Sequence, residues 1–243
     1  MKRMIPFVLI WIGSCLLADC RKSTPAPIQP IDSTDTVTPT PVRKSWLALG
    51  DSYTIGQSVS VLERFPAQTI DSLFQRGLFI NDLTYIAATG WTCNALESTI
   101  QSRSAELRPP YSIVSLLIGV NDQYPLRDTF GYREKFTRLL AKSIELAGNR
   151  TDRVFVLSIP DYSVTPFAQG SDTTLIRQQL DRYNIINKEE SYRYGVSYTD
   201  ITPSTRQARY DRTLLAYDSL HPSGKEYAKW AQLLAPKIRQ VFN

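Results

Sequence analysis

Short apolar runs alternate with longer amphipathic stretches over most of the chain. Five runs are almost continuously apolar and lie at residues 46–49, 83–87, 113–118, 154–159 and 196–198. Strands that are buried on both faces of a parallel sheet have this character, because neither face meets water. We therefore predict a parallel sheet of about five strands.

The stretches between these runs carry apolar residues at helical spacing. One helix is predicted to have Pro66 in its first turn and to stop at Gly77. A second has an apolar stripe over 132–147, and a third covers 175–194. The last begins with the capping-box pattern of residues 223–226, Ser-Gly-Lys-Glu. Strand and helix alternate five times, which predicts an α/β protein with a three-layer α/β/α sandwich.

The N-terminal segment has a different pattern. Lys2 and Arg3 precede an apolar stretch at 4–17 that is too short to span a bilayer and is typical of an export signal. In residues 23–41, 12 of 19 are Ser, Thr or Pro, a composition that cannot offset the entropy cost of ordering. We predict three segments: a lipoprotein-type signal peptide (1–19), a disordered linker (20–43) and one globular domain (44–243).

Two cysteines at the end of the export signal are candidates for lipidation. Both Cys15 and Cys20 follow an aliphatic residue and small residues, as in the bacterial lipobox. Cys15 has the better small residues before it, whereas Cys20 gives the more usual signal length and directly precedes the linker. We favour Cys20 and keep Cys15 as the alternative. The expected location is a membrane, with the lipoprotein facing the periplasm or the cell surface; plain secretion is the other reading.

Composition narrows the classes of function. The net charge of +5 is spread along the chain without a basic block, which argues against a nucleic-acid partner. The chain has one histidine and three cysteines, and Cys93 is the only cysteine in the predicted domain. These are too few nitrogen and sulfur ligands for a zinc site, so we expect no metal and no cofactor. We expect Cys93 to be buried and inert.

The single histidine, His221, lies close to Asp218 in the chain, and Ser52 follows the first apolar run after Gly50 and Asp51. A serine hydroxyl is a weak nucleophile near neutral pH and needs an adjacent base, usually a histidine held by a carboxylate. Gly90 and Asn121 follow the second and third runs, and ligands of open parallel sheets bind beyond the carboxyl ends of the strands. The sequence therefore predicts a serine hydrolase.

Four segments in order resemble the conserved blocks of the SGNH/GDSL hydrolase superfamily, and the likeness covers residues 45–243. They are Gly50-Asp51-Ser52-Tyr53, then Gly90, then Gly119-Val120-Asn121-Asp122, and last Asp218-Ser219-Leu220-His221-Pro222. The resemblance implies a flavodoxin-like sandwich, in agreement with the pattern of runs. Tyr53 departs from the leucine of the namesake pattern, at a position that we place outside the chemistry.

The resemblance also implies roles for individual residues. Ser52 would be the nucleophile, His221 the general base and acid, and Asp218 the residue that orients His221, with Asp211 as an alternative acid. The oxyanion hole would be formed by the backbone N–H groups of Ser52 and Gly90 and by the side-chain amide of Asn121. Three further acids are expected to support turns: Asp51 and Asp122 of these segments, and Asp161, which follows the fourth apolar run.

We expect a serine esterase that cleaves short acyl or acetyl esters, including esters on glycans, through an acyl-serine intermediate. Its expected partners are a small-molecule or glycan ester and a membrane. A lysophospholipase or a thioesterase of the same family remains an alternative. A surface binding module that has lost the chemistry is the alternative from another class, although this chain keeps both Ser52 and His221.

Overall fold

The structure, a computed structural model, describes residues 43–126 and 128–242. The predicted signal peptide, Cys15, Cys20 and the predicted linker up to residue 42 lie outside the described residues. The segment boundaries therefore stay predictions.

Within the described residues, five parallel strands form one sheet in the order β2-β1-β3-β4-β5. They are β1 (Ser45–Gly50), β2 (Asp82–Ala87), β3 (Ile113–Leu117), β4 (Val154–Leu157) and β5 (Ser197–Thr199). The chain starts at β1, winds outward to β2, then crosses back to β3, which is the flavodoxin-like order. This confirms the predicted α/β class, and each strand ends within two residues of its apolar run.

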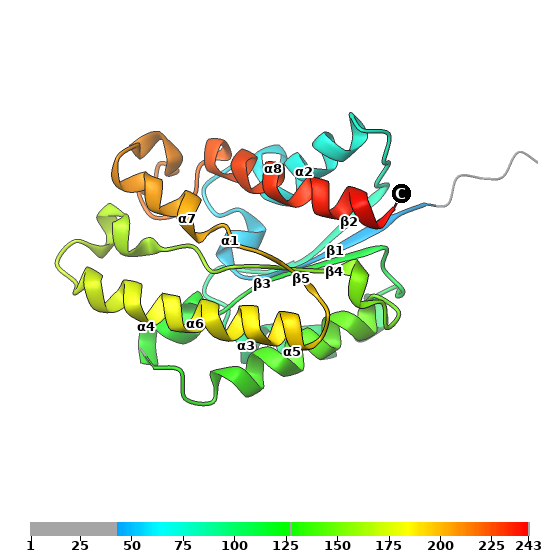
Figure 1. Ribbon diagram of the computed structural model, residues 1–243, viewed down its shortest axis with the longest axis horizontal. Helices are drawn as coiled ribbons and strands as arrows, with labels where there is room; N and C mark the ends of the chain where they lie inside the picture. Colours follow the sequence, from blue (N-terminus) through cyan, green and yellow to red (C-terminus); the bar gives the residue numbers. More distant parts are fainter. Residues whose placement is uncertain (1–42, 127, 243) are drawn as a thin grey trace, which may run out of the picture. The chain divides into compact units, whose positions relative to one another are not determined.

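Helices cover both faces of the sheet, as Figure 1 shows. On one face α2 (Phe65–Phe74) packs against α8 (Gly224–Val241), and the opposite face carries α3 (Cys93–Ser102), α5 (Tyr132–Leu146) and α6 (Thr173–Arg193). The result is the predicted three-layer sandwich. The short helices α1 (Ser52–Ile55), α4 (Val120–Leu126) and α7 (Thr202–Thr205) lie beyond strand ends.

Two details of the helices differ from the prediction. Helix α3 was not predicted, because it buries only the narrow stripe of Cys93, Leu96 and Ile100 and is otherwise polar. The predicted capping box at the start of α8 does not form. Ser223 is the N-cap, but its hydroxyl donates to the Thr213 carbonyl at 2.7 Å instead of receiving a helix N–H.

The carboxyl ends of the central strands meet at one edge of the sheet. Gly50, the last residue of β1, is in register with Ala87 of β2 and Leu117 of β3. The residues of β1 and β3 are almost completely buried, so the ends of these two strands are anchored in the core. Helix α1 begins two residues after Gly50, and α4 begins three residues after the end of β3. This edge therefore brings together the predicted site segments.

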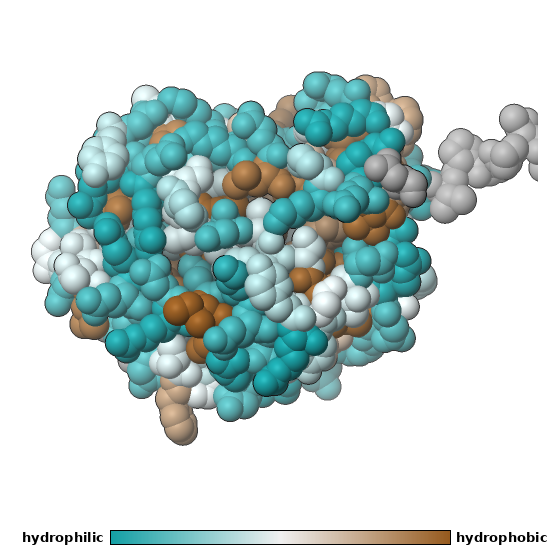
Figure 2. All heavy atoms as spheres, in the orientation of Figure 1, coloured by the Kyte–Doolittle hydropathy of each residue, from teal (hydrophilic) through white to brown (hydrophobic). Residues whose placement is uncertain are grey.

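The surface seen in Figure 2 is mostly hydrophilic, with small and separate hydrophobic patches. Among the described residues, no helix combines the length and the apolar character that crossing a membrane requires.

Candidate active site

The nucleophile candidate lies in a tight turn between β1 and α1. Asp51 is the N-cap of α1, and its Oδ1 accepts the N–H of Tyr53 at 2.9 Å. A Cβ on Gly50 would lie 2.1 Å from Thr54 Oγ1 and 2.3 Å from the carbonyl oxygen of Leu117, so only glycine fits. Ser52 is thus the first residue of a helix, where its N–H has no acceptor within the helix.

A second tight turn carries the acid and base candidates. Asp218 Oδ1 accepts the backbone N–H groups of Leu220 at 3.0 Å and His221 at 2.9 Å, and Ser219, directly after Asp218, has a positive φ of 58°. Asp218 Oδ2 lies 2.7 Å from His221 Nδ1. The carboxylate therefore fixes both the backbone of the turn and the direction of the imidazole ring. Asp211, the alternative acid, instead bonds Thr213 and Lys225.

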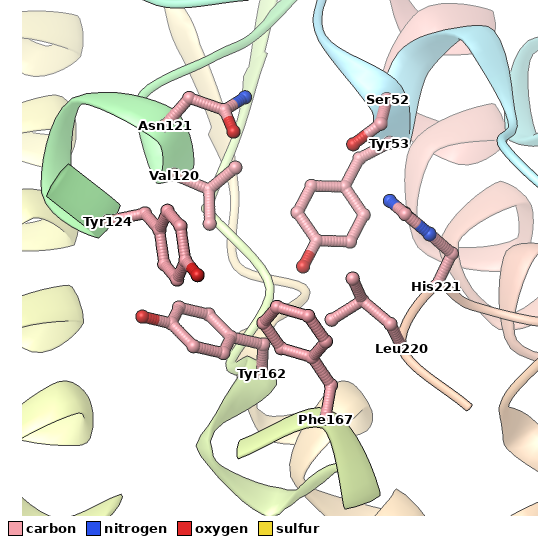
Figure 3. Close-up of a pocket in the computed structure, with 9 residues that line it drawn as sticks. All are labelled: Ser52, Tyr53, Val120, Asn121, Tyr124, Tyr162, Phe167, Leu220 and His221. Carbon is pink, nitrogen blue, oxygen red and sulfur yellow. The ribbon is translucent and has the colours of Figure 1, made fainter. Parts of the chain in front are cut away.

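His221 and Ser52 face the same cavity from opposite turns. His221 is 7% exposed, and its ring packs edge-on against Tyr53 at a centroid distance of 5.6 Å. Figure 3 shows one ring nitrogen directed toward the Ser52 hydroxyl; because Nδ1 is taken by Asp218, that nitrogen is Nε2. No hydrogen bond joins these two described side chains. Such bonds are often long without substrate and tighten in the reacting complex.

The charge of Asp218 is stabilised by its surroundings. Burial raises the pKa of this carboxyl, but hydrogen bonds from Ser58, from His221 and from the Leu220 N–H outweigh burial and bring it to about 2. Asp218 is therefore a carboxylate at every pH at which an esterase would ordinarily work. A fixed negative charge beside Nδ1 favours the tautomer that leaves Nε2 free to accept a proton.

Asn121, the amide candidate for the oxyanion hole, lies on α4 and lines the cavity beside Ser52 (Figure 3). Its Nδ2 donates to the carbonyl of Trp91 at 3.0 Å, which fixes the orientation of the amide. Gly119 before it has φ +126°, and a Cβ there would lie 2.3 Å from the Tyr132 hydroxyl. The glycine is therefore required for the close approach of this loop to α5.

Gly90 lies near Asn121 but does not line the cavity. It follows β2, has φ +82° and is exposed, and a Cβ there would meet no atom within 4 Å. The residue after it, Trp91, provides the carbonyl that holds Asn121. Among the predicted site residues, Ser52, Asn121 and His221 line the cavity and Asp218 bonds His221, whereas Gly90 lies at the margin.

The cavity itself is small, about 110 Å³, and largely aromatic. Its lining residues are Ser52, Tyr53, Val120, Asn121, Tyr124, Tyr162, Phe167, Leu220 and His221 (Figure 3). Three of the rings, those of Tyr124, Tyr162 and Phe167, contact one another at centroid distances of 6.1–6.3 Å.

Five of these lining residues had no role assigned to them from the sequence: Val120, Tyr124, Tyr162, Phe167 and Leu220. A signal existed for Tyr124, which lies one helical turn after Asn121, and for Tyr162, which follows a strand end. Tyr53 corrects our expectation. We placed it outside the chemistry, yet it is only 3% exposed, lines the cavity and packs on His221.

The other acids near the site have structural partners. Asp122 Oδ2 accepts the Cys93 N–H at 2.8 Å, and Asp161 Oδ2 accepts from Arg206 Nε at 2.8 Å. Asp51 is completely buried; burial and the nearby charge of Asp122 raise its pKa to about 8, although the Tyr53 N–H lowers it. At neutral pH Asp51 is therefore mostly protonated. Cys93 is 1% exposed, and burial raises the pKa of its thiol well above the ordinary value.

The described residues contain no group of three or more His, Cys, Asp or Glu side chains placed to hold a metal ion. The chemistry that this arrangement can supply is that of a hydroxyl, an imidazole and a carboxylate, together with an amide donor. The same sequence segments match the model of the GDSL-like lipase/acylhydrolase family over residues 48–229. The chain belongs to this family. It is accordingly an ester hydrolase.

Several solved structures have a fold similar to that of this chain. A lipolytic protein of the G-D-S-L family from Veillonella parvula is 19% identical, with a TM-score of 0.56, and the match covers 82% of this chain and 98% of that one. For a lipase/acylhydrolase from Enterococcus faecalis the identity is 17%, the TM-score 0.60 and the coverage 81% and 96%. An acetylxylan esterase from Geobacillus stearothermophilus is 19% identical, with a TM-score of 0.56, and the match covers 80% of this chain and 94% of that one. No curated protein matches the chain.

Proposed function

We propose that the protein is a serine esterase in which Ser52, His221 and Asp218 form the catalytic triad. One observation carries this proposal. The only histidine of the chain is held by Asp218 through Nδ1 at 2.7 Å, and its other ring nitrogen faces Ser52 in the same cavity. A general base that is oriented by a fixed carboxylate is what a serine nucleophile requires.

The reaction follows from these positions. Ser52 Oγ attacks the ester carbonyl carbon while its proton moves to His221 Nε2, and Asp218 stabilises the resulting imidazolium. The carbonyl oxygen becomes an oxyanion that accepts from the Ser52 N–H and the Asn121 amide, with the Gly90 N–H as a further donor. Collapse of this intermediate breaks the ester bond, and the leaving alcohol takes the proton from Nε2. Water then attacks the acyl-serine by the same steps and releases the acid.

The size of the cavity favours a short acyl group. A dry cavity of about 150 Å³ accommodates a benzene molecule, and this one holds about 110 Å³. An acetyl or similarly short acyl chain fits that volume, whereas the long chain of a lysophospholipid would have to extend outside it. The cavity thus favours short-chain esterase activity over lysophospholipase activity.

The aromatic side of the cavity favours a sugar as the alcohol part of the ester. The side chains of Tyr124 and Phe167 are 49% and 50% exposed, and Tyr162 packs against both. Exposed rings of this kind offer flat apolar surfaces on which the C–H faces of a sugar can pack. We therefore propose acetylated glycans as the substrate class; one protein of similar fold is named an acetylxylan esterase.

The test is a panel of substrates assayed with the wild type and with Ser52→Ala. p-Nitrophenyl acetate, butyrate and octanoate report acyl length, and acetylated xylo-oligosaccharides report the alcohol part. We expect kcat/KM to fall steeply from acetate to octanoate, and Ser52→Ala to have no measurable turnover. A preference for octanoate would overturn the short-acyl proposal. A wild type that binds acetylated sugars without hydrolysing any ester would support a binding module instead.

A further inference from the structure

A serine outside the recognised motifs contacts the carboxylate of the candidate triad. Ser58 Oγ donates to Asp218 Oδ2 at 2.6 Å, a bond that joins residues 160 positions apart in the chain. Ser58 lies in the loop that follows α1, and α1 begins with Ser52. The loop next to the nucleophile therefore reaches across the site to the acid.

This bond completes the hydrogen bonding of the carboxylate. Asp218 Oδ1 accepts two backbone N–H groups, from Leu220 and His221, and Oδ2 accepts from the His221 ring and from Ser58. Each oxygen thus has two donors, which is about the full capacity of a carboxylate. The hydroxyl and the imidazole share one oxygen, so the Ser58 bond acts on the atom that faces His221.

The backbone at Ser58 is one that side chains rarely adopt. Its φ is +67°, in the left-handed region that favours glycine. The loop is held on both sides: Thr89 Oγ1 donates to Gln57 Oε1 at 2.7 Å, and the Val59 N–H donates to the Gly56 carbonyl at 3.3 Å. A non-glycine residue kept in such a conformation is a feature found at functional sites. Here the side chain that this conformation presents to Asp218 is a hydroxyl.

We propose that Ser58 is a positioning residue of the esterase: it holds Asp218 Oδ2 against His221 and shares the negative charge of that oxygen. The proposal rests on the triad assigned above. Without the hydroxyl, the two N–H bonds to Oδ1 keep Asp218 in its turn, but Oδ2 is held less firmly against His221 and its charge acts more fully on the imidazole. The protonated ring then becomes more stable, and the base is available only at higher pH.

Other ionisable groups lie around His221 and around Tyr53, which packs against its ring. Tyr53, Tyr124 and Tyr162 line the cavity with His221, and Asp51, Asp161 and Tyr227 lie around Tyr53. Asp161 is paired with Arg206, and burial raises the pKa values of Tyr53 and Tyr227 well above the ordinary range. Burial raises the pKa of Asp51 to about 8, so this group ionises mainly above neutral pH.

The single histidine makes the test direct, because all imidazole signals in an NMR spectrum of the full chain belong to His221. The ring signals are followed against pH in the wild type, Ser58→Ala and Ser58→Gly, and kcat and KM are measured on p-nitrophenyl acetate. Ser60→Ala is the matched control, since the Ser60 hydroxyl lies in the same loop but donates to Glu63 at 2.8 Å. Ser58→Asn tests rescue, because asparagine tolerates a positive φ and can donate through its amide.

For both Ser58→Ala and Ser58→Gly we expect the titration midpoint of the ring to rise by about half a pH unit. We also expect kcat to fall about tenfold, with KM unchanged. Ser60→Ala should match the wild type, and Ser58→Asn should recover part of the loss. The proposal would be overturned if both Ser58 variants kept the titration midpoint and the kcat of the wild type. It would also be overturned if neither variant folded, because the proposed role of Ser58 is in catalysis and not in folding. Full activity of Ser52→Ala would refute the triad itself, which keeps the two failures distinct.

Discussion

The side-chain amide of Asn121 donates to the carbonyl oxygen of Trp91 at 3.0 Å. The bond links the turn after β3 to the turn after β2, so two neighbouring strand ends fix one donor. One amide hydrogen is used by Trp91, and the second remains available to a developing oxyanion. A donor that is oriented before the substrate binds needs no reorganisation during the reaction.

Replacing Asn121 with alanine should therefore slow catalysis without disturbing the fold. Loss of one oxyanion donor lowers kcat by about 10²–10³-fold, or roughly 2.7–4 kcal/mol of transition-state stabilisation. Steady-state kinetics on p-nitrophenyl acetate measure the effect, and circular dichroism checks the fold. Asn94→Ala, an exposed asparagine of α3, is the control and should keep the wild-type rate. A wild-type kcat in Asn121→Ala would remove this residue from the oxyanion hole.

The Asp218→Asn change should reduce kcat by about 10³–10⁴-fold. An asparagine can keep the two N–H bonds of the turn through Oδ1, but its amide would then face His221 Nδ1 as a donor. The ring would turn to the tautomer that carries its proton on Nε2 and could no longer accept one from Ser52. Asp211→Asn, which removes the acid bonded to Lys225, should leave kcat unchanged. Equal loss in both variants would contradict the assignment of Asp218.

The pH dependence of the wild type should come from the imidazole on the acidic side. The pKa of Asp218 is about 2, because the hydrogen bonds from Ser58 and His221 outweigh the effect of burial. This carboxylate therefore keeps its charge as the pH falls to 4. The values of kcat/KM should decline as the pH falls, because protonation of His221 removes the general base. An activity that persists undiminished to pH 4 would exclude His221 as the base.

The site residues that could be predicted from the sequence are those of a rare residue type and those that follow a predicted strand. Ser52 and Asn121 follow buried runs, and His221 is the only imidazole, so chemistry and topology both pointed to them. The cavity wall was different. Phe167 reaches it from a short 3-10 helix (Pro166–Ala168) whose placement depends on tertiary packing, and no spacing in the chain reveals that this helix meets the site. Leu220 directly precedes His221, but the sequence does not show that its side chain points into the cavity.

Tyr53 and Ser58 show two further limits of the sequence. Tyr53 was judged only by its difference from a motif, but its position in the first turn of α1 directs the ring toward His221. Ser58 belongs to no motif, and its bond to Asp218 depends on a positive φ that a serine residue does not predict. Backbone conformations of this kind are imposed by the surrounding structure rather than by local preference.

Asp51 makes the free energy of unfolding depend on pH between about 4 and 8. Its pKa is about 8 in the folded protein, chiefly through burial, against the ordinary 3.8. The folded state therefore keeps a proton that the unfolded state loses, and the free energy of unfolding falls as the pH rises from 4 to 8. The slope from this group is up to about 1.4 kcal/mol per pH unit. Above pH 8 both states are ionised and the contribution is constant.

Asp51→Asn should remove this dependence, since asparagine keeps an oxygen for the Tyr53 N–H and never ionises. Denaturant unfolding of the variant and the wild type at pH 5, 6.5 and 8 measures the difference. The stability of Asp51→Asn relative to the wild type should increase across this series. Asp71→Asn, at an exposed acid of α2, should show no such trend. A difference that is independent of pH would mean that Asp51 is ionised in the folded protein.

The N-terminal segment gives the last prediction, which rests on the sequence. We propose that the mature protein is a lipoprotein anchored through Cys20, with Cys15 as the alternative. One acyl chain gives only marginal membrane binding, and bacterial lipoprotein processing provides more than one.

The full-length protein expressed in a bacterium should therefore sediment with membranes and be extracted by detergent. Cys20→Ala should release it to the soluble fraction if Cys20 is the anchor, and Cys15→Ala should release it if the alternative holds. Both variants should hydrolyse p-nitrophenyl acetate as fast as the wild type, because neither cysteine belongs to the esterase domain. Membrane association that survives the double variant, or its absence in the wild type, would show that the protein is secreted or held by another means.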